Sequence, residues 1–112
     1  YAMAHSNLGG ILKELGKLKE AEIYTRKAIE LKPDQHDVYS NLGIILKDLG
    51  KLKEAELSCR KAIEIKPDFA AAYEVLGKIS SVLRRKIESN EYYKKALDLE
   101  PWKVVSAWEI NS

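Results

Sequence analysis

The sequence predicts an all-α fold, an α-solenoid of three antiparallel helical hairpins with a partial capping helix at the C-terminal end. The first observation is an internal repeat, since residues 1–34 and 35–68 are identical at 23 of 34 aligned positions. The second is that apolar residues recur at helical spacing on both sides of a short break in each repeat. The third is that glycine and proline stand at matching places in successive repeats, where they end helices.

The first repeat, residues 1–34, shows the hairpin pattern in full. Gly16 separates its two helices, because glycine tolerates the left-handed backbone angles at which a helix usually ends. Pro33 ends the second helix, because the residue before a proline is pushed out of helical geometry. The two predicted apolar stripes are Leu8, Ile11, Leu12 and Leu15, and then Leu18, Ala21, Thr25, Ala28 and Ile29.

Residues 35–68 repeat this layout, with Gly50 at the turn and Pro67 at the end. Small residues recur in both helices of every repeat, and we expect each pair to let two backbones approach. A larger residue at Gly43 should therefore overpack the hairpin, at a cost of about 1–3 kcal/mol. The expected pairs are Gly9 with Ala28, Gly43 with Ala62, and Gly77 with Ala96.

The third repeat, residues 69–102, departs from the first two. Arg84 replaces the turn glycine, Lys86 the following leucine and Ser89 the small alanine, which leaves the geometry of this turn open. Residues 103–112 begin another helical pattern, which we expect to form the partial capping helix, with Trp108 on the last hairpin. We expect residues 1–112 to form a single domain of a longer array.

The run Asn-Leu-Gly, followed by Leu, Gly, Ala, Ala and Pro at these spacings, resembles the tetratricopeptide repeat (TPR) over residues 1–102. The repeats are similar to those in the TPR arms of O-linked N-acetylglucosamine transferases and in bacterial TPR proteins. The resemblance implies a right-handed superhelix and a non-catalytic module that binds an extended peptide or a partner helix in a concave groove. The matching residues are Leu8, Gly9, Ala21, Ala28 and Pro33, with their equivalents 34 positions on.

The first helices would line that groove and supply its binding residues. We expect three lysines and four carboxylates there, Glu14, Asp37, Asp48 and Glu74, and no aromatic ring. This excludes nucleic acid as the partner, because phosphates need concentrated cations and single strands need stacking rings. The candidate peptide-binding residues are Asn7, Lys13, Asn41, Ile44, Lys47 and Lys78.

Asn7 and Asn41 occupy the same groove position one repeat apart, and Val75 follows at that position in repeat three. Each amide can donate and accept hydrogen bonds, so the pair could grip a peptide by its backbone. The alternative is that asparagine before Leu-Gly is a common, solvated residue of the repeat. The sequence leaves both interpretations open.

One TPR subclass clamps the free carboxylate of chaperone tails with two lysines, two asparagines and a third cation. The matching positions here hold Ser6, Gly10, Asn41, Ala71 and Val75, of which only Asn41 fits. We therefore expect no chaperone-tail binding, because a buried carboxylate without cations is costly.

Two further functions remain open, a substrate-presenting arm of a larger enzyme such as a glycosyltransferase, and a structural scaffold that self-associates end to end. We expect no enzyme and no cofactor, because catalytic motifs are missing, and no metal at His5 or His36. Cys59 reads as a small buried hydrophobe. The basic run 83–86 reads as a solvated loop or, alternatively, a dock for an acidic partner. With 32% charged residues and no apolar span or signal peptide, we expect a cytoplasmic, non-membrane protein.

Overall fold

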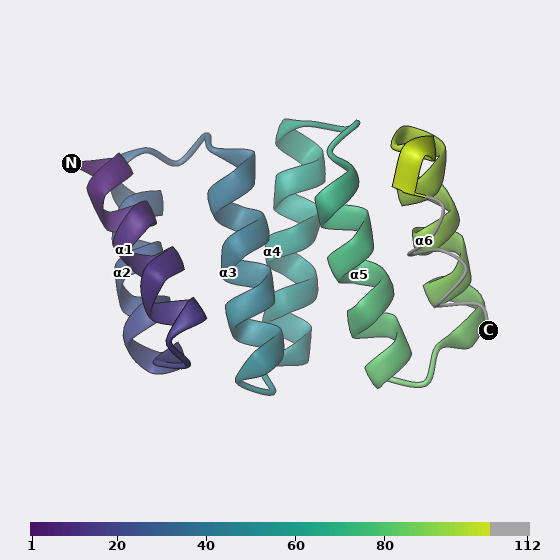
Figure 1. The fold of residues 1–112 in the computed structure, drawn as a ribbon, viewed down its shortest axis with the longest axis horizontal. Helices are drawn as coiled ribbons and strands as arrows, with labels where there is room; N and C mark the ends of the chain where they lie inside the picture. The colour runs from purple at the N-terminus through teal and green to yellow at the C-terminus, as the bar shows by residue number, and fades with distance from the viewer. Residues whose placement is uncertain (104–112) are drawn as a thin grey trace.

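The computed structural model describes residues 1–103, which form six α-helices in hairpin order and one short 3₁₀ helix (Figure 1). No strand occurs in this part of the chain, so the predicted all-α fold is confirmed. The array is elongated, with extents of 40 × 25 × 22 Å. The elements are α1 (Ala2–Glu14), α2 (Leu18–Leu31), α3 (His36–Asp48), α4 (Leu52–Ile65), α5 (Ala70–Val82), α6 (Lys86–Leu99) and η1 (Pro101–Lys103).

The turns inside the first two hairpins have the predicted form. Gly16 and Gly50 adopt left-handed φ values of 79° and 82°. The N–H of Gly16 donates to the Lys13 carbonyl at 3.0 Å, and the N–H of Lys17 donates to the Leu12 carbonyl at 2.8 Å. These two bonds form a Schellman motif, which satisfies carbonyls at the end of α1.

The third repeat keeps this turn without a glycine. Arg84 has a φ of 60°, its N–H donates to the Ser81 carbonyl, and the N–H of Arg85 donates to the Ser80 carbonyl. The eroded repeat therefore folds into the same hairpin as the other two. Arg84 holds a conformation that disfavours residues with a Cβ.

Each hairpin closes around the predicted glycine, but against a different residue than expected. A Cβ on Gly43 would lie 2.5 Å from Sγ of Cys59, and one on Gly9 would meet Thr25 first. Ala28 and Ala62 are buried, yet they lie one helical turn farther along and are not the nearest neighbours. The predicted pairing was wrong, because the length of the turn decides the register of the two helices and the sequence spacing alone does not show it.

Successive hairpins stack through their apolar faces, with α2 against α3 and α4 against α5. The largest core cluster joins repeats two and three through side chains of α3, α4 and α5. Its members are Leu42, Leu46, Ala55, Cys59, Val75, Leu76 and Ile79. Residues 104–112 lie outside the described residues, so the capping helix and the place of Trp108 stay predictions.

Candidate functional site

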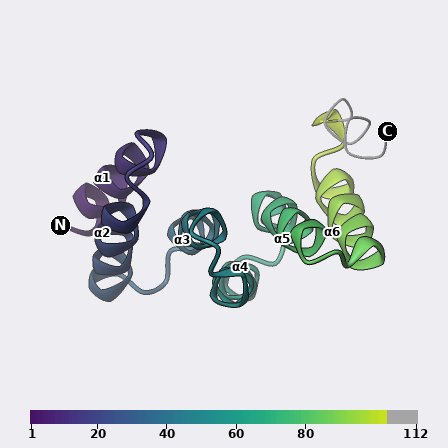
Figure 2. The same ribbon diagram turned by 90° about the horizontal axis from the view of Figure 1, so that it is seen from below.

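The helices α1, α3 and α5 lie side by side along one side of the array. The backbones of α1 and α3, and of α3 and α5, approach closely, whereas α2 and α4, and α4 and α6, stand farther apart. Among the described residues these second helices meet through long side chains, as in the hydrogen bonds of Arg26 with Glu54 and of Arg60 with Tyr92. The array therefore curves toward the first helices, and Figure 2 shows α4 on the outer side of the bend. The side of α1, α3 and α5 is the concave face.

An open hollow of about 580 Å³ lies on this face between α1 and α3. It brings together three of the predicted binding residues, Asn7, Lys13 and Asn41. Glu14 and Asp37 also line it, so its charge is close to neutral with a small acidic excess. The full lining is Ser6, Asn7, Gly10, Ile11, Lys13, Glu14, Asp37 and Asn41. We call it the α1–α3 hollow.

The two asparagine amides are open to a ligand. Asn7 is exposed and Asn41 is half-buried beside α1. Within residues 1–103, neither amide makes a hydrogen bond to another group of the chain. Each can therefore offer a donor and an acceptor to a ligand in the hollow.

The groove lysines are partly neutralised by their neighbours. Nζ of Lys13 lies 3.9 Å from Oε1 of Glu14, and Nζ of Lys47 lies 3.1 Å from Oδ1 of Asp48. The side chains of Lys13 and Lys47 are only 18% and 21% exposed. Their aliphatic stems thus pack along the concave face while the charges stay paired at its edge.

The remaining predicted residues do not join the α1–α3 hollow. Lys78 is exposed on α5, and Ile44 is half-buried against the core cluster of repeats two and three. Val75, which was expected at the groove position of Asn7 and Asn41, is buried with an exposure of 4%, as is Ser40 of α3 with an exposure of 3%. They are buried because neighbouring first helices contact one another, and the residues between them leave the solvent.

A second open hollow, of about 610 Å³, lies between α5 and α6, and we call it the α5–α6 hollow. Every lining side chain is polar, two are cationic and none is a carboxylate. Its lining residues are Ser81, Arg84, Lys86, Ser89, Asn90 and Tyr93. The sequence analysis singled out three of them, Arg84, Lys86 and Ser89, without joining them into a site. Position-by-position comparison of the three repeats could have found Asn90 and Tyr93 as well.

The two histidines and the cysteine each contact other groups of the chain. The His36 ring packs edge-on against the Phe69 ring, with 4.6 Å between the ring centres. Nδ1 of His5 lies 2.7 Å from the Tyr1 carbonyl oxygen. Burial, and next the charge of Glu56, raises the pKa of the Cys59 thiol to about 12, so the thiolate is scarce at neutral pH. In the described part of the chain no group of three potential ligands could hold a metal, and no helix is long and apolar enough to cross a membrane.

Family models of the tetratricopeptide repeat match residues 2–35 and 36–69, which together exceed half of the chain. A comparison with curated protein sequences gave no significant match. Among solved structures, MamA is similar at 30% identity and a TM-score of 0.83, over 93% of this chain and 61% of the MamA chain. This chain therefore spans less than two thirds of the length of that relative.

Two further solved structures are TPR domains. The first TPR of Spaghetti (RPAP3), solved with the HSP90 peptide SRMEEVD, is 25% identical with a TM-score of 0.85, over 89% of this chain and 79% of that one. The Arabidopsis OM64 TPR domain is 24% identical with a TM-score of 0.91, over 98% and 92% of the two chains. The OM64 likeness shows the fold alone.

Proposed function

This chain belongs to the tetratricopeptide-repeat family, and we propose that its concave face holds an extended segment of a partner protein by the segment's backbone. The chain would then act as a protein-interaction module, and the α1–α3 hollow would be the place where it binds the segment. The observation that carries the proposal is the pair of equivalent amides, Asn7 and Asn41, in one hollow with no partner among residues 1–103. A peptide backbone offers alternating donors and acceptors, which two such amides can match.

The charge of the α1–α3 hollow favours binding of a peptide segment along the segment's length. It does not favour binding of the free carboxylate at a peptide's C-terminus. Ser6 and Gly10 stand at two of the positions where a carboxylate clamp needs cations or amides, and both line the α1–α3 hollow. Its one cation, Lys13, is already beside Glu14. The Spaghetti domain, solved with an HSP90 peptide, supports a peptide partner in general. The cations of a carboxylate clamp are missing at Ser6 and Gly10, so we do not propose a chaperone tail.

Replacement of both asparagines tests the proposal. We expect Asn7→Ala with Asn41→Ala to weaken binding of library-selected peptides about tenfold, since two hydrogen bonds contribute about 0.5–1.5 kcal/mol each. Fluorescence anisotropy with labelled peptides measures the change. The matched control is Lys19→Ala with Lys53→Ala, an exposed pair one repeat apart on α2 and α4. Unchanged affinity in the asparagine variant would mean that both residues are merely solvated.

A second candidate is end-to-end self-association, which the exposed end of the first hairpin favours. Ile11 is 56% exposed, whereas its equivalent Ile45 in repeat two is fully buried between hairpins. A second copy could cover this apolar end. Sedimentation at rising concentration should then show growing mass, and a strict monomer throughout would exclude the candidate.

A further inference from the structure

The α5–α6 hollow is lined almost entirely by residues at which repeat three differs from the first two repeats. Five of its six lining positions hold one residue in both of the first two repeats and another in the third. At the sixth position Tyr93 replaces Thr25 and Cys59. The five replacements are Lys to Ser81, Gly to Arg84, Leu to Lys86, Ala to Ser89 and Glu to Asn90. A hollow made of such changes has a chemistry that the other repeats do not have.

These changes turn a balanced surface into a cationic one. In repeat two the six positions hold one cation, Lys47, and one carboxylate, Glu56. In repeat three they hold Arg84 and Lys86 and no carboxylate. Within residues 1–103, neither of these two side chains has an ion-pair partner. Their charges are thus available to a ligand.

Arg85, between these two cations, plays a different part. Its Nη1 lies 3.3 Å from Oε2 of Glu56 and 3.8 Å from Oε2 of Glu88, so its charge is already neutralised. Free positive charge is therefore not a property of every cation in this basic turn. It belongs to the two residues that line the hollow.

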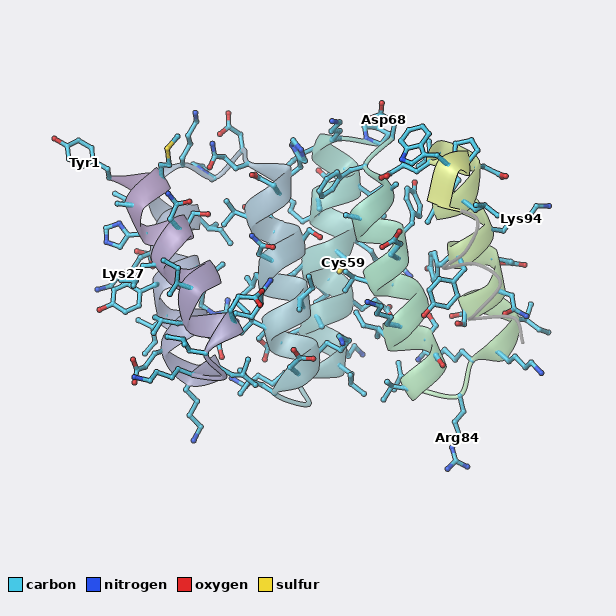
Figure 3. The ribbon with its side chains drawn as sticks, viewed as in Figure 1. Tyr1, Lys27, Cys59, Asp68, Arg84 and Lys94 are labelled. Carbon is cyan, nitrogen blue, oxygen red and sulfur yellow. The ribbon has the colours of Figure 1, made fainter. Side chains whose placement is uncertain are left out.

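The backbone at Arg84 is a second, independent observation. Its φ of 60° costs an L-residue roughly 1–2 kcal/mol, which the glycines of the first two repeats avoid. Strain of this kind often accompanies residues whose side chains have a use. Figure 3 shows the Arg84 side chain extending from the α5–α6 turn, away from the two helices.

Neutral donors complete the lining. Burial, with the charge of Glu74 as a smaller cause, raises the pKa of Tyr93, so its hydroxyl keeps its proton at neutral pH. The Asn90 amide and the Ser81 hydroxyl make no hydrogen bond to other described residues, whereas the Ser89 hydroxyl donates to the Gly77 carbonyl at 2.9 Å. A carboxylate in the hollow would find two cations and several donors, which is a favourable set.

We propose that the α5–α6 hollow binds acidic side chains of the partner segment and so decides which end of that segment lies at repeat three. The hollow adjoins the C-terminal end of the concave face through Ser81, which stands on α5 at the position equivalent to Lys13 and Lys47. The α1–α3 hollow at the other end has Glu14 and Asp37, which disfavour acidic residues. The inference rests on the proposed binding of an extended segment.

The length of the array sets the probe. Its long axis is 40 Å, and an extended chain advances about 3.3–3.6 Å per residue, so about 12 residues span it. Two labelled peptides of that length serve, one with a glutamate cluster in one half and one with glutamine in its place. Both are titrated into the full chain at low and at raised salt.

The variants use equal changes of charge. Arg84→Gln with Lys86→Gln removes two cations from the hollow, and Lys19→Gln with Lys53→Gln removes two exposed cations from α2 and α4. We expect the first variant to bind the glutamate peptide at least tenfold more weakly and the glutamine peptide unchanged. The control should stay within twofold for both peptides. Asn90→Glu, which restores the carboxylate of the other repeats, should also weaken the glutamate peptide and leave the fold intact.

The outcomes separate this inference from the proposed function. Equal binding of both peptides to the parent overturns the inference, while sensitivity to Asn7→Ala with Asn41→Ala still supports the groove. Binding of neither peptide overturns both. Equal losses in the two lysine and arginine variants would mean non-specific attraction. Binding of single-stranded RNA in place of the glutamate peptide, lost with Arg84→Gln and Lys86→Gln, would assign the hollow to nucleic acid.

Discussion

At the scale of single residues, the contact between Gly43 and Cys59 decides how closely α3 and α4 approach. Sγ of Cys59 is fully buried and lies 2.5 Å from the place where a Cβ on Gly43 would stand. The sulfur has no solvent to move into, and Ala55 of α4 lies on the same side. Gly10, in contrast, faces open space on the concave face of α1.

This difference predicts opposite effects of one methyl group. Gly43→Ala should lower the free energy of unfolding by about 1–3 kcal/mol through overpacking. Gly10→Ala should raise it by roughly 0.5–1 kcal/mol, because alanine favours the helix and meets no neighbour. Urea unfolding followed by circular dichroism measures both. Adding Cys59→Ala to Gly43→Ala should recover part of the loss, and strict additivity of the two changes would refute the contact.

At the scale of elements, the three turns share one hydrogen-bond pattern although the third differs in sequence from the first two. The pattern requires a left-handed residue at positions 16, 50 and 84, and only the first two hold glycine. The packing of α5 against α6 forces Arg84 into this conformation, so the third hairpin folds in spite of a local preference against it. A glycine at position 84 would remove this strain.

Arg84→Gly should therefore stabilise the protein by about 1 kcal/mol, because relief of the strain exceeds the added flexibility of the unfolded chain. The reciprocal change, Gly50→Arg, should destabilise it by a similar amount. Thermal unfolding of the two variants beside the parent checks the pair. A loss of stability in Arg84→Gly would show that the arginine side chain stabilises the turn more than its backbone strains it.

At the scale of the whole molecule, ion pairs link successive repeats along the second helices. Glu22 contacts Arg26 of its own helix at 2.9 Å and Lys51 of the next repeat at 3.0 Å. One repeat on, Glu56 contacts Arg60 at 3.5 Å and Arg85 at 3.3 Å. Asn90 stands at the third such position, so the series ends within repeat three.

The inter-repeat pairs make stability depend on pH in the acid range. Burial acts to raise the pKa of Glu22, but hydrogen bonds and charges of Arg26 and Lys51 outweigh it and hold the pKa below 4.5. The carboxylate thus stabilises the fold above pH 4.5, and this contribution disappears as the pH falls through the folded pKa. The substitution Glu22→Gln should lower the free energy of unfolding by about 0.5–1 kcal/mol at neutral pH.

The free energies of unfolding of Glu22→Gln and of the parent should then converge at acid pH, once the pH has fallen below the folded pKa of Glu22. The control is Glu30→Gln, an exposed residue of α2 without an ion pair among the described residues, which should lose nothing. An equal deficit of Glu22→Gln at both pH values would mean that shape, and not charge, is responsible.

The candidate site was predictable in part. Equal position in the repeat placed Asn7 and Asn41 on one face, and the structure brings them to one hollow with Lys13. The same reasoning failed for Val75, since helical spacing shows which way a side chain points but not which neighbouring helix covers it. The α5–α6 hollow was missed because its residues come from both helices and the turn, which only the closed hairpin brings together.

The sequence by itself determined the all-α fold, the three hairpins and the turns at Gly16 and Gly50, because these depend on periodicity and local backbone preference. The tertiary structure decided which residues meet. Thr25 and Cys59 face the hairpin glycines, Arg84 takes a glycine's conformation, and Ile45 is buried where the identical Ile11 is exposed. Those facts depend on the neighbours that packing supplies, and identical repeats have different neighbours along the array.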